Sequence, residues 1–197
     1  MVAKINRGVS LYGAIVYNQQ KVDDATARII YGNRMITDVT GNPEQVMRQT
    51  IWAFENYLLA NKNTEKPVLH ISLNPSLDDR LTDSQFADLA KEYMQKMGYG
   101  DQPYIVFKHK DIDREHLHVV SLRVDEQGRK LPHDFEARRS MEILRDLECK
   151  YGLQPSVKGQ ELTDREGLRK VNYPEGNVKQ RISSVVRSCL RNYKCSS

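Results

Sequence analysis

Three of the five histidines in this 197-residue chain fall within ten residues, as His109, His116 and His118. They lie on two strand-like segments, PYIVFKH at 103–109 and HLHVVSLRVD at 116–125, with a short polar turn between them. Two such segments most readily form an antiparallel hairpin. Residues two apart in a strand point to the same face, so His116 and His118 project together and the hairpin brings His109 beside them. We therefore expect a sheet with three imidazoles on one face.

Three convergent imidazoles are a metal-binding pattern. They leave coordination positions free for water or substrate, which is typical of a catalytic metal site rather than of a closed structural one. The turn acids Asp111, Asp113 and Glu115 are candidates to orient the imidazoles by hydrogen bonding, and Asp111 is the preferred one. Surface histidines on a polar turn, or a purely structural metal site, are the alternatives.

Apolar side chains recur at helical or strand spacing along the first 155 residues. Helices are expected to start at the Ser10 cap, to run over 42–61 with Asn42 as the cap, to follow the Thr82–Gln85 capping box, and to run over 135–151. Strands are expected over 67–74 and in the hairpin, with short extended pieces within 23–40. This order favours an α+β or layered α/β fold around an antiparallel sheet.

The segment 135–151 has a strong helical pattern, in which Met141, Leu144, Leu147 and Cys149 are expected to face the core. The stretch after it is polar and interrupted by Gly and Pro, and a basic helix candidate follows over 178–192. We therefore expect one globular domain over 1–155 and a basic extension over 156–197.

The net charge is only +4, but residues 178–197 contain five lysines and arginines and no acid. Lys179 and Arg181 belong to this group, which permits a polyanionic partner. A solvated basic helix face explains the same residues equally well.

The chain has the features of a cytoplasmic protein. No apolar run approaches the roughly 20 residues that cross a bilayer, and the amino terminus lacks a secretory pattern. Cys149, Cys189 and Cys195 are too few and too irregularly spaced for a disulfide framework, so reduced thiols are expected.

The segment HKDIDREHLHVV resembles the His-x-Asp and His-x-His motif of the relaxase/mobilisation nuclease family, the MOB-P-like, HUH-type relaxases of mobilisable plasmids and transposons. The stretch 66–107 is similar to the strand, helix, Gly-Tyr turn and strand that precede this motif in mobilisation relaxases. Near the start, GVSLYGAIVYNQQK resembles the family's first motif, which ends in the nucleophilic tyrosine. Together the similarities cover roughly residues 4–155.

This resemblance implies a central antiparallel sheet of about five strands with flanking helices. It implies that His109, His116 and His118 bind a divalent cation, with Mg²⁺ or Mn²⁺ expected, although imidazole ligands do not select the metal. The nucleophile's role falls to Tyr17, with Tyr12 as the second choice. A tyrosine suits this chemistry because a phosphotyrosine link conserves the phosphodiester for later rejoining.

The implied activity is that of a site- and strand-specific DNA relaxase. Such an enzyme nicks the origin of transfer, forms a 5′-phosphotyrosine intermediate, leaves a free 3′-OH and starts conjugative mobilisation. The expected partner is single-stranded DNA at that origin with an adjacent hairpin. An accessory mobilisation protein and a coupling protein are further expected partners, and no membrane partner is expected.

Several polar residues are candidates for DNA contacts. Ser72 falls on the family's middle motif, in HISLN, and could contact the DNA backbone. Arg123 follows on the histidine strand, with Arg129 and Lys130 in its loop, and such groups commonly position phosphates. Lys179 and Arg181 would act from the basic extension, closing over the DNA cleft. Strand alternation and ordinary loop charges explain the same residues.

Three other functions compete with this one. A rolling-circle replication initiator or single-strand transposase shares the chemistry but commonly places its tyrosine after the histidines, where Tyr151 is the residue to test. A phosphoesterase with paired His-x-Ser/Thr motifs finds one half in His70-Ile-Ser72 but lacks the other. A non-catalytic metal-containing module that binds nucleic acid is the third, and it predicts that metal removal unfolds the domain.

Overall fold

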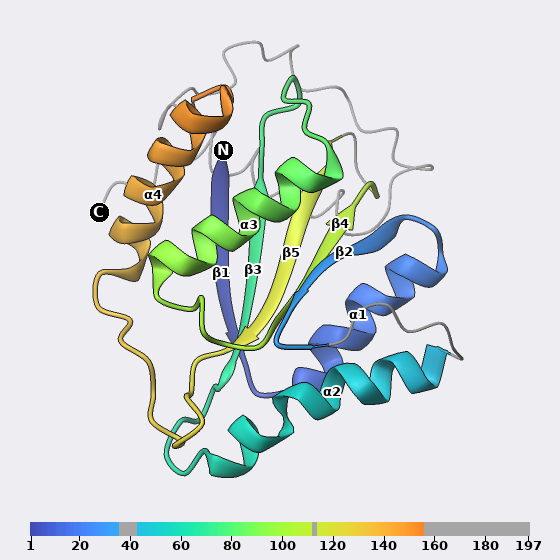
Figure 1. The fold of residues 1–197 in the computed structure, drawn as a ribbon, viewed down its shortest axis with the longest axis vertical. Helices are drawn as coiled ribbons and strands as arrows, with labels where there is room; N and C mark the ends of the chain where they lie inside the picture. Colours follow the sequence, from blue (N-terminus) through green and yellow to red (C-terminus); the bar gives the residue numbers. More distant parts are fainter. Residues whose placement is uncertain (36–42, 112–113, 156–197) are drawn as a thin grey trace, which may run out of the picture. The chain divides into compact units, whose positions relative to one another are not determined.

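A five-stranded sheet forms the centre of the fold, in the order β1-β3-β5-β4-β2 with every neighbouring pair antiparallel (Figure 1). The computed structural model describes residues 1–35, 43–111 and 114–155, which lie in one compact unit of the chain. The expected α+β fold with an antiparallel sheet of about five strands is confirmed. The expected extension with Lys179 and Arg181 lies outside the described residues, as does the Asn42 cap, and the boundary at residue 155 stays a prediction.

Strands and helices alternate along the chain before the hairpin. The elements are β1 (Val2–Gly8), α1 (Leu11–Asp23), β2 (Ala27–Asn33), α2 (Pro43–Ala60), β3 (Val68–Asn74), α3 (Asp83–Met97), β4 (Tyr104–His109), β5 (His116–Leu122) and α4 (Glu136–Tyr151). None of the helices in the described ranges is long and apolar enough to cross a membrane.

The sheet carries a separate apolar core on each face. On one face α3 and α4 pack against residues such as Val119, and on the other α1 and α2 pack against residues such as Val120. Because side chains alternate along a strand, His116 and His118 share the face of Val120, which is the face that α1 and α2 cover. These two helices lie toward the β2 edge of the sheet (Figure 1).

Local sequence signals set the ends of the best-defined helices. Thr82 and Gln85 form the expected reciprocal capping box at the start of α3, and Gly98 ends that helix in the left-handed conformation, with φ of 86°. Ser10 caps α1 as expected, because its Oγ accepts a hydrogen bond from the Gly13 N–H at 2.9 Å.

The sequence pattern does not predict β1. Its only apolar inward positions, Ala3 and Ile5, are half-buried, and the alternating Lys4 and Asn6 are exposed, as suits an edge strand. Pairing with β3, rather than its own hydrophobicity, makes this segment a strand.

Two expected core residues of α4 are exposed. Met141 is 41% exposed and Cys149 is an exposed free thiol. The buried face of α4 instead combines Leu144 and Leu147 with the polar Glu136, Ser140 and Glu148. These polar residues have buried partners: Glu136 accepts from Tyr99 at 2.8 Å, Ser140 bonds Tyr93 at 2.7 Å, and Glu148 pairs with the terminal amino group. The buried face of α4 therefore differs from the expected one. It includes polar residues with hydrogen-bond partners, and a search for regularly spaced apolar residues does not count them.

Candidate functional site

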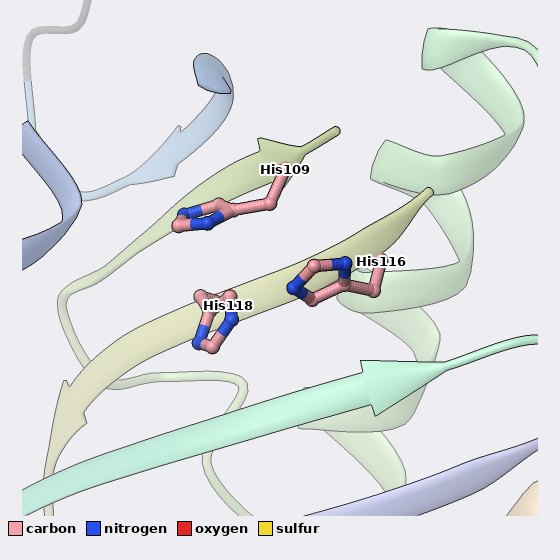
Figure 2. A group of neighbouring side chains, drawn as sticks. All are labelled: His109, His116 and His118. Atoms are coloured by element: carbon pink, nitrogen blue, oxygen red, sulfur yellow. The ribbon is translucent and has the colours of Figure 1, made fainter. Parts of the chain in front are cut away.

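The β4–β5 hairpin brings the three histidines together as the sequence predicts. His109 lies directly opposite His116, and His118 lies opposite Phe107. Figure 2 shows the three rings on the same side of the two strands. One ring nitrogen from each histidine lies within 4.8 Å of the others. This spacing suits three ligands around one ion, because metal–nitrogen bonds of about 2.1 Å place ligand atoms roughly 3 to 4 Å apart.

One nitrogen of each ring has a hydrogen-bond partner. His118 Nδ1 lies 2.8 Å from His70 Nε2, His109 Nε2 lies 2.9 Å from Asn18 Oδ1, and His116 Nδ1 lies 3.3 Å from the Arg114 carbonyl oxygen. Metal-binding histidines usually have such partners, which fix the ring orientation.

His109 also has a nitrogen whose hydrogen-bonding capacity a metal ion would satisfy. His109 Nδ1 is buried and has no hydrogen-bond partner among the described residues. A buried polar atom without a partner is costly, so a ligand at this position relieves that cost. The donor set of three imidazoles suits a divalent transition metal and leaves coordination positions free.

Asp111 lies directly beside this group. Its Oδ1 is 3.7 Å from His116 Nε2 and 4.0 Å from His109 Nδ1, and its Oδ2 is 3.1 Å from Lys21 Nζ. Burial opposes the charged carboxylate, but the Lys21 hydrogen bond and the neighbouring positive charge outweigh it and lower the pKa of Asp111. Its carboxylate therefore faces the same space as two of the histidine nitrogens. A role in orienting these histidines stays a prediction.

Burial keeps two of the imidazoles neutral. Together with the charge of the neighbouring histidines, it lowers the pKa of His118 to about 3 and that of His109 to about 4. A neutral imidazole has the free lone pair that metal binding requires. The apo site is therefore ready to bind a cation at neutral pH.

The metal-free protein is expected to lose stability as pH falls from about 6.5 to about 5. In this window the unfolded chain takes up protons on His109 and His118, whose reference pKa is 6.5, whereas the folded chain does not until about 4 and about 3. Each histidine should weaken folding by up to about tenfold per pH unit. Urea unfolding midpoints in chelator, at both ends of the window, measure this. His118→Asn should show a shallower dependence, and an equal slope in both proteins would contradict the assignment.

Tyr17 projects from α1 toward the histidines. Its ring centroid lies 6.4 Å from that of His109, 6.3 Å from that of His118 and 6.5 Å from that of His70. The residue is 46% exposed, so a substrate can reach part of it. Tyr12, the second choice, is 61% exposed, and no ring contact places it at the histidines within the described part of the chain.

The expected DNA-contacting residues divide into two groups. Ser72 lies directly opposite His118 on the neighbouring strand β3, and therefore belongs to the histidine site. Arg123, by contrast, is 4% exposed and follows the far end of β5. Arg129 bonds Asp125 at 2.8 Å, and Lys130 lies 3.2 Å from His133, in the loop beyond it. The structure thus does not bring these three basic residues to Tyr17, and the burial of Arg123 argues against a DNA contact.

Sequence reasoning missed three residues of the site. His70 could have been found from the sequence, because it lies two residues before Ser72 on the same strand face and is itself a histidine. Asn18 and Lys21 follow Tyr17 on α1, and contact His109 and Asp111. Nothing in the sequence alone distinguishes these two from the other polar residues of that helix.

Comparison with known protein families identifies a match. The family model described as "Relaxase: MobA/VirD2-like, nuclease domain" matches residues 17–153, which is more than half of the chain. The matched range starts at Tyr17 and includes all three histidines. No curated protein matches the chain.

Proposed function

Because this chain belongs to the relaxase family, as a MobA/VirD2-like nuclease domain, we propose that it nicks one strand at an origin of transfer through a 5′-phosphotyrosine intermediate. Family membership makes the chain a DNA-binding nickase in general terms. The site and strand specificity, the covalent intermediate and the start of conjugative mobilisation are the finer parts of the proposal.

The observation that carries this proposal is the position of Tyr17. Its half-exposed phenol stands beside the histidine group, with ring centroids 6.3 and 6.4 Å from His118 and His109. A metal site alone fits hydrolysis by water, whereas a tyrosine next to it supplies a nucleophile that stays attached to the DNA.

The proposed reaction is a transesterification. The Tyr17 oxygen bonds to the scissile phosphorus, the bond from phosphorus to the 3′ oxygen breaks, and the phenol's proton is balanced by one taken up at that 3′ oxygen. His109, His116 and His118 would hold a divalent cation, Mg²⁺ or Mn²⁺. Such an ion supplies Lewis-acid stabilisation of the negative charge on the phosphate oxygens.

Lys21 adds positive charge to the same place. It lies one helical turn after Tyr17, and its ammonium group is within electrostatic range of that phenol while it pairs with Asp111. In the proposed reaction, this positive charge would favour binding of the negatively charged scissile phosphate. Asp111 would orient the nearby imidazoles and keep Lys21 in place.

The proposed substrate is single-stranded DNA with an adjacent hairpin, and Ser72 would contact its backbone. In support, β1 is an edge strand, and its Lys4 lies directly opposite Ser72 and is exposed. A single strand could therefore pass over Lys4 and Ser72 to reach Tyr17. An accessory mobilisation protein and a coupling protein remain proposed partners, and Lys179 and Arg181 proposed contacts.

The test is denaturing electrophoresis of the protein with a labelled single-stranded oligonucleotide from its own element's origin of transfer. A covalent protein–DNA band that forms with Mn²⁺ or Mg²⁺ and disappears with chelator is expected. A cleaved oligonucleotide with no attached protein would indicate a hydrolytic nuclease and overturn the covalent part of the proposal.

The initiator or transposase alternative is less well supported. It needs a tyrosine after the histidines, and the residue to test was Tyr151. That side chain packs with the α3 and α4 core, on the opposite face of the sheet from His118. The family match and the position of Tyr17 favour the relaxase.

The binding-module alternative is distinguished by removing the metal. We expect chelator to leave the domain folded at room temperature, because apolar cores on both faces of the sheet hold it together. Metal at 100 times its Kd should add only about 2.7 kcal/mol to the free energy of unfolding. Far-UV circular dichroism with and without chelator measures this. Complete unfolding in chelator would favour a structural metal.

A further inference from the structure

The side chain of Asn18 connects the tyrosine helix to the histidine hairpin. It follows Tyr17 directly in α1, is fully buried, and its Oδ1 lies 2.9 Å from His109 Nε2 on β4. The two residues are 91 positions apart in the sequence. A fully buried asparagine is uncommon unless its amide is hydrogen-bonded.

A second hydrogen bond fixes which way the Asn18 amide faces. Its Nδ2 donates to the Ala14 carbonyl oxygen at 2.7 Å, so its Oδ1 must be the atom that faces His109. An amide oxygen only accepts hydrogen bonds, so His109 Nε2 must carry the proton and donate. The neutral ring then has its lone pair on Nδ1, the buried atom without a partner among the described residues.

We propose that Asn18 is a positioning residue, which holds His109 so that it binds the metal through Nδ1 while His116 and His118 bind through Nε2. The inference rests on the proposed metal-dependent function and deepens it. In His118 and His116 the hydrogen-bonded nitrogen is Nδ1, so Nε2 is left for the metal. His118 Nδ1 faces His70, and His116 Nδ1 faces a carbonyl oxygen. The site would thus have one Nδ1 and two Nε2 ligands.

The same hydrogen bond ties the nucleophile to the metal site. Tyr17 and Asn18 share one backbone segment of α1, so a shift of the helix away from β4 would break the bond to His109. Asn18 therefore fixes both a ligand's orientation and the distance between the phenol and the metal. Small displacements of this kind can cost about 100-fold in rate.

The direct test needs no DNA and no variant. Zinc is a diamagnetic ion that suits histidine ligands, and long-range ¹H–¹⁵N correlation spectra of the Zn²⁺-loaded full chain report which nitrogen of each histidine binds. We expect a metal-bound Nδ1 and a protonated Nε2 for His109, with the reverse for His116 and His118. A metal-bound Nε2 on His109 would overturn the proposal.

Variants test the role of Asn18 itself. Asn18→Leu removes the acceptor at similar size and should weaken Mn²⁺ binding by about 10- to 100-fold in calorimetry. Asn18→Asp keeps an acceptor for His109 Nε2 but loses the donor to the Ala14 carbonyl oxygen, so it should recover only part of that loss. Gln19→Leu is the matched control, because Gln19 is buried on the same helix but bonds Asp23 at 2.9 Å.

The outcomes separate this inference from the proposed function. If Asn18→Leu binds Mn²⁺ as the wild type does, the positioning role is wrong even where the wild type forms the covalent adduct. If the wild type forms no adduct but the variants behave as expected, the metal-site assignment stands and the relaxase chemistry fails.

Discussion

Tyr17→Phe should abolish the covalent protein–DNA adduct and lower the nicking rate by more than about 1,000-fold, as removal of a catalytic nucleophile generally does. The substitution removes only the hydroxyl oxygen. The ring can keep its contacts with the histidines, so metal binding and the free energy of unfolding should change little. Denaturing electrophoresis with a labelled origin strand and Mn²⁺ measures the adduct, and calorimetry measures the metal.

Tyr12→Phe is the matched control for this experiment. Tyr12 lies on the same helix, five residues before Tyr17, and is 61% exposed. Its substitution likewise removes only a hydroxyl oxygen. We expect it to form the adduct at close to the wild-type rate. An adduct that survives in Tyr17→Phe and disappears in Tyr12→Phe would move the nucleophile to Tyr12 and leave the reaction class intact.

His118→Ala should weaken Mn²⁺ binding by more than about 100-fold and remove nicking at micromolar metal. Loss of even an outer hydrogen-bond partner of a metal ligand costs about 10- to 100-fold, and His118 is a proposed ligand itself. The fold should survive, because His118 is a half-buried polar residue and its loss leaves the apolar cores on both faces of the sheet intact. Calorimetry measures binding, and circular dichroism checks the fold.

His133→Ala controls for the general effect of losing an imidazole. His133 lies in the loop before α4 and contacts Lys130 at 3.2 Å, away from the histidine site. Its variant should bind metal and nick DNA normally. Wild-type metal affinity in His118→Ala would show that the three histidines do not form the metal site, whatever the result with Tyr17→Phe.

Local sequence patterns were enough to predict how the three histidines are arranged. His116 and His118 could be placed on one face because strand geometry alternates with a period of two, and His109 because a short turn requires a hairpin. The register of the strands, with His109 opposite His116, agrees with this reasoning. The α3 capping box was equally local, since Thr82 and Gln85 are three residues apart.

Sequence patterns gave wrong or no predictions where a segment is stabilised by contacts with another element of the fold rather than by its own residues. β1 is a strand because it pairs with β3, although its exposed Lys4 and Asn6 make it look like an irregular segment. In α4, Met141 has the hydrophobicity of a core residue but lies off the buried face, which instead contains hydrogen-bonded Glu136 and Ser140. Apolar periodicity does not register a polar group whose partner is on another element.

The sequence by itself determined the α+β class, the hairpin with its three histidines, and, through resemblance, the relaxase family to which the chain belongs. Only the tertiary structure decided what surrounds the histidines. Asn18 reaches His109 across 91 positions and His70 reaches His118 across 48, because α1 and β3 pack or pair with the hairpin. The physical reason is that periodicity encodes which face a residue points to, whereas the partner on that face depends on how distant segments pack together.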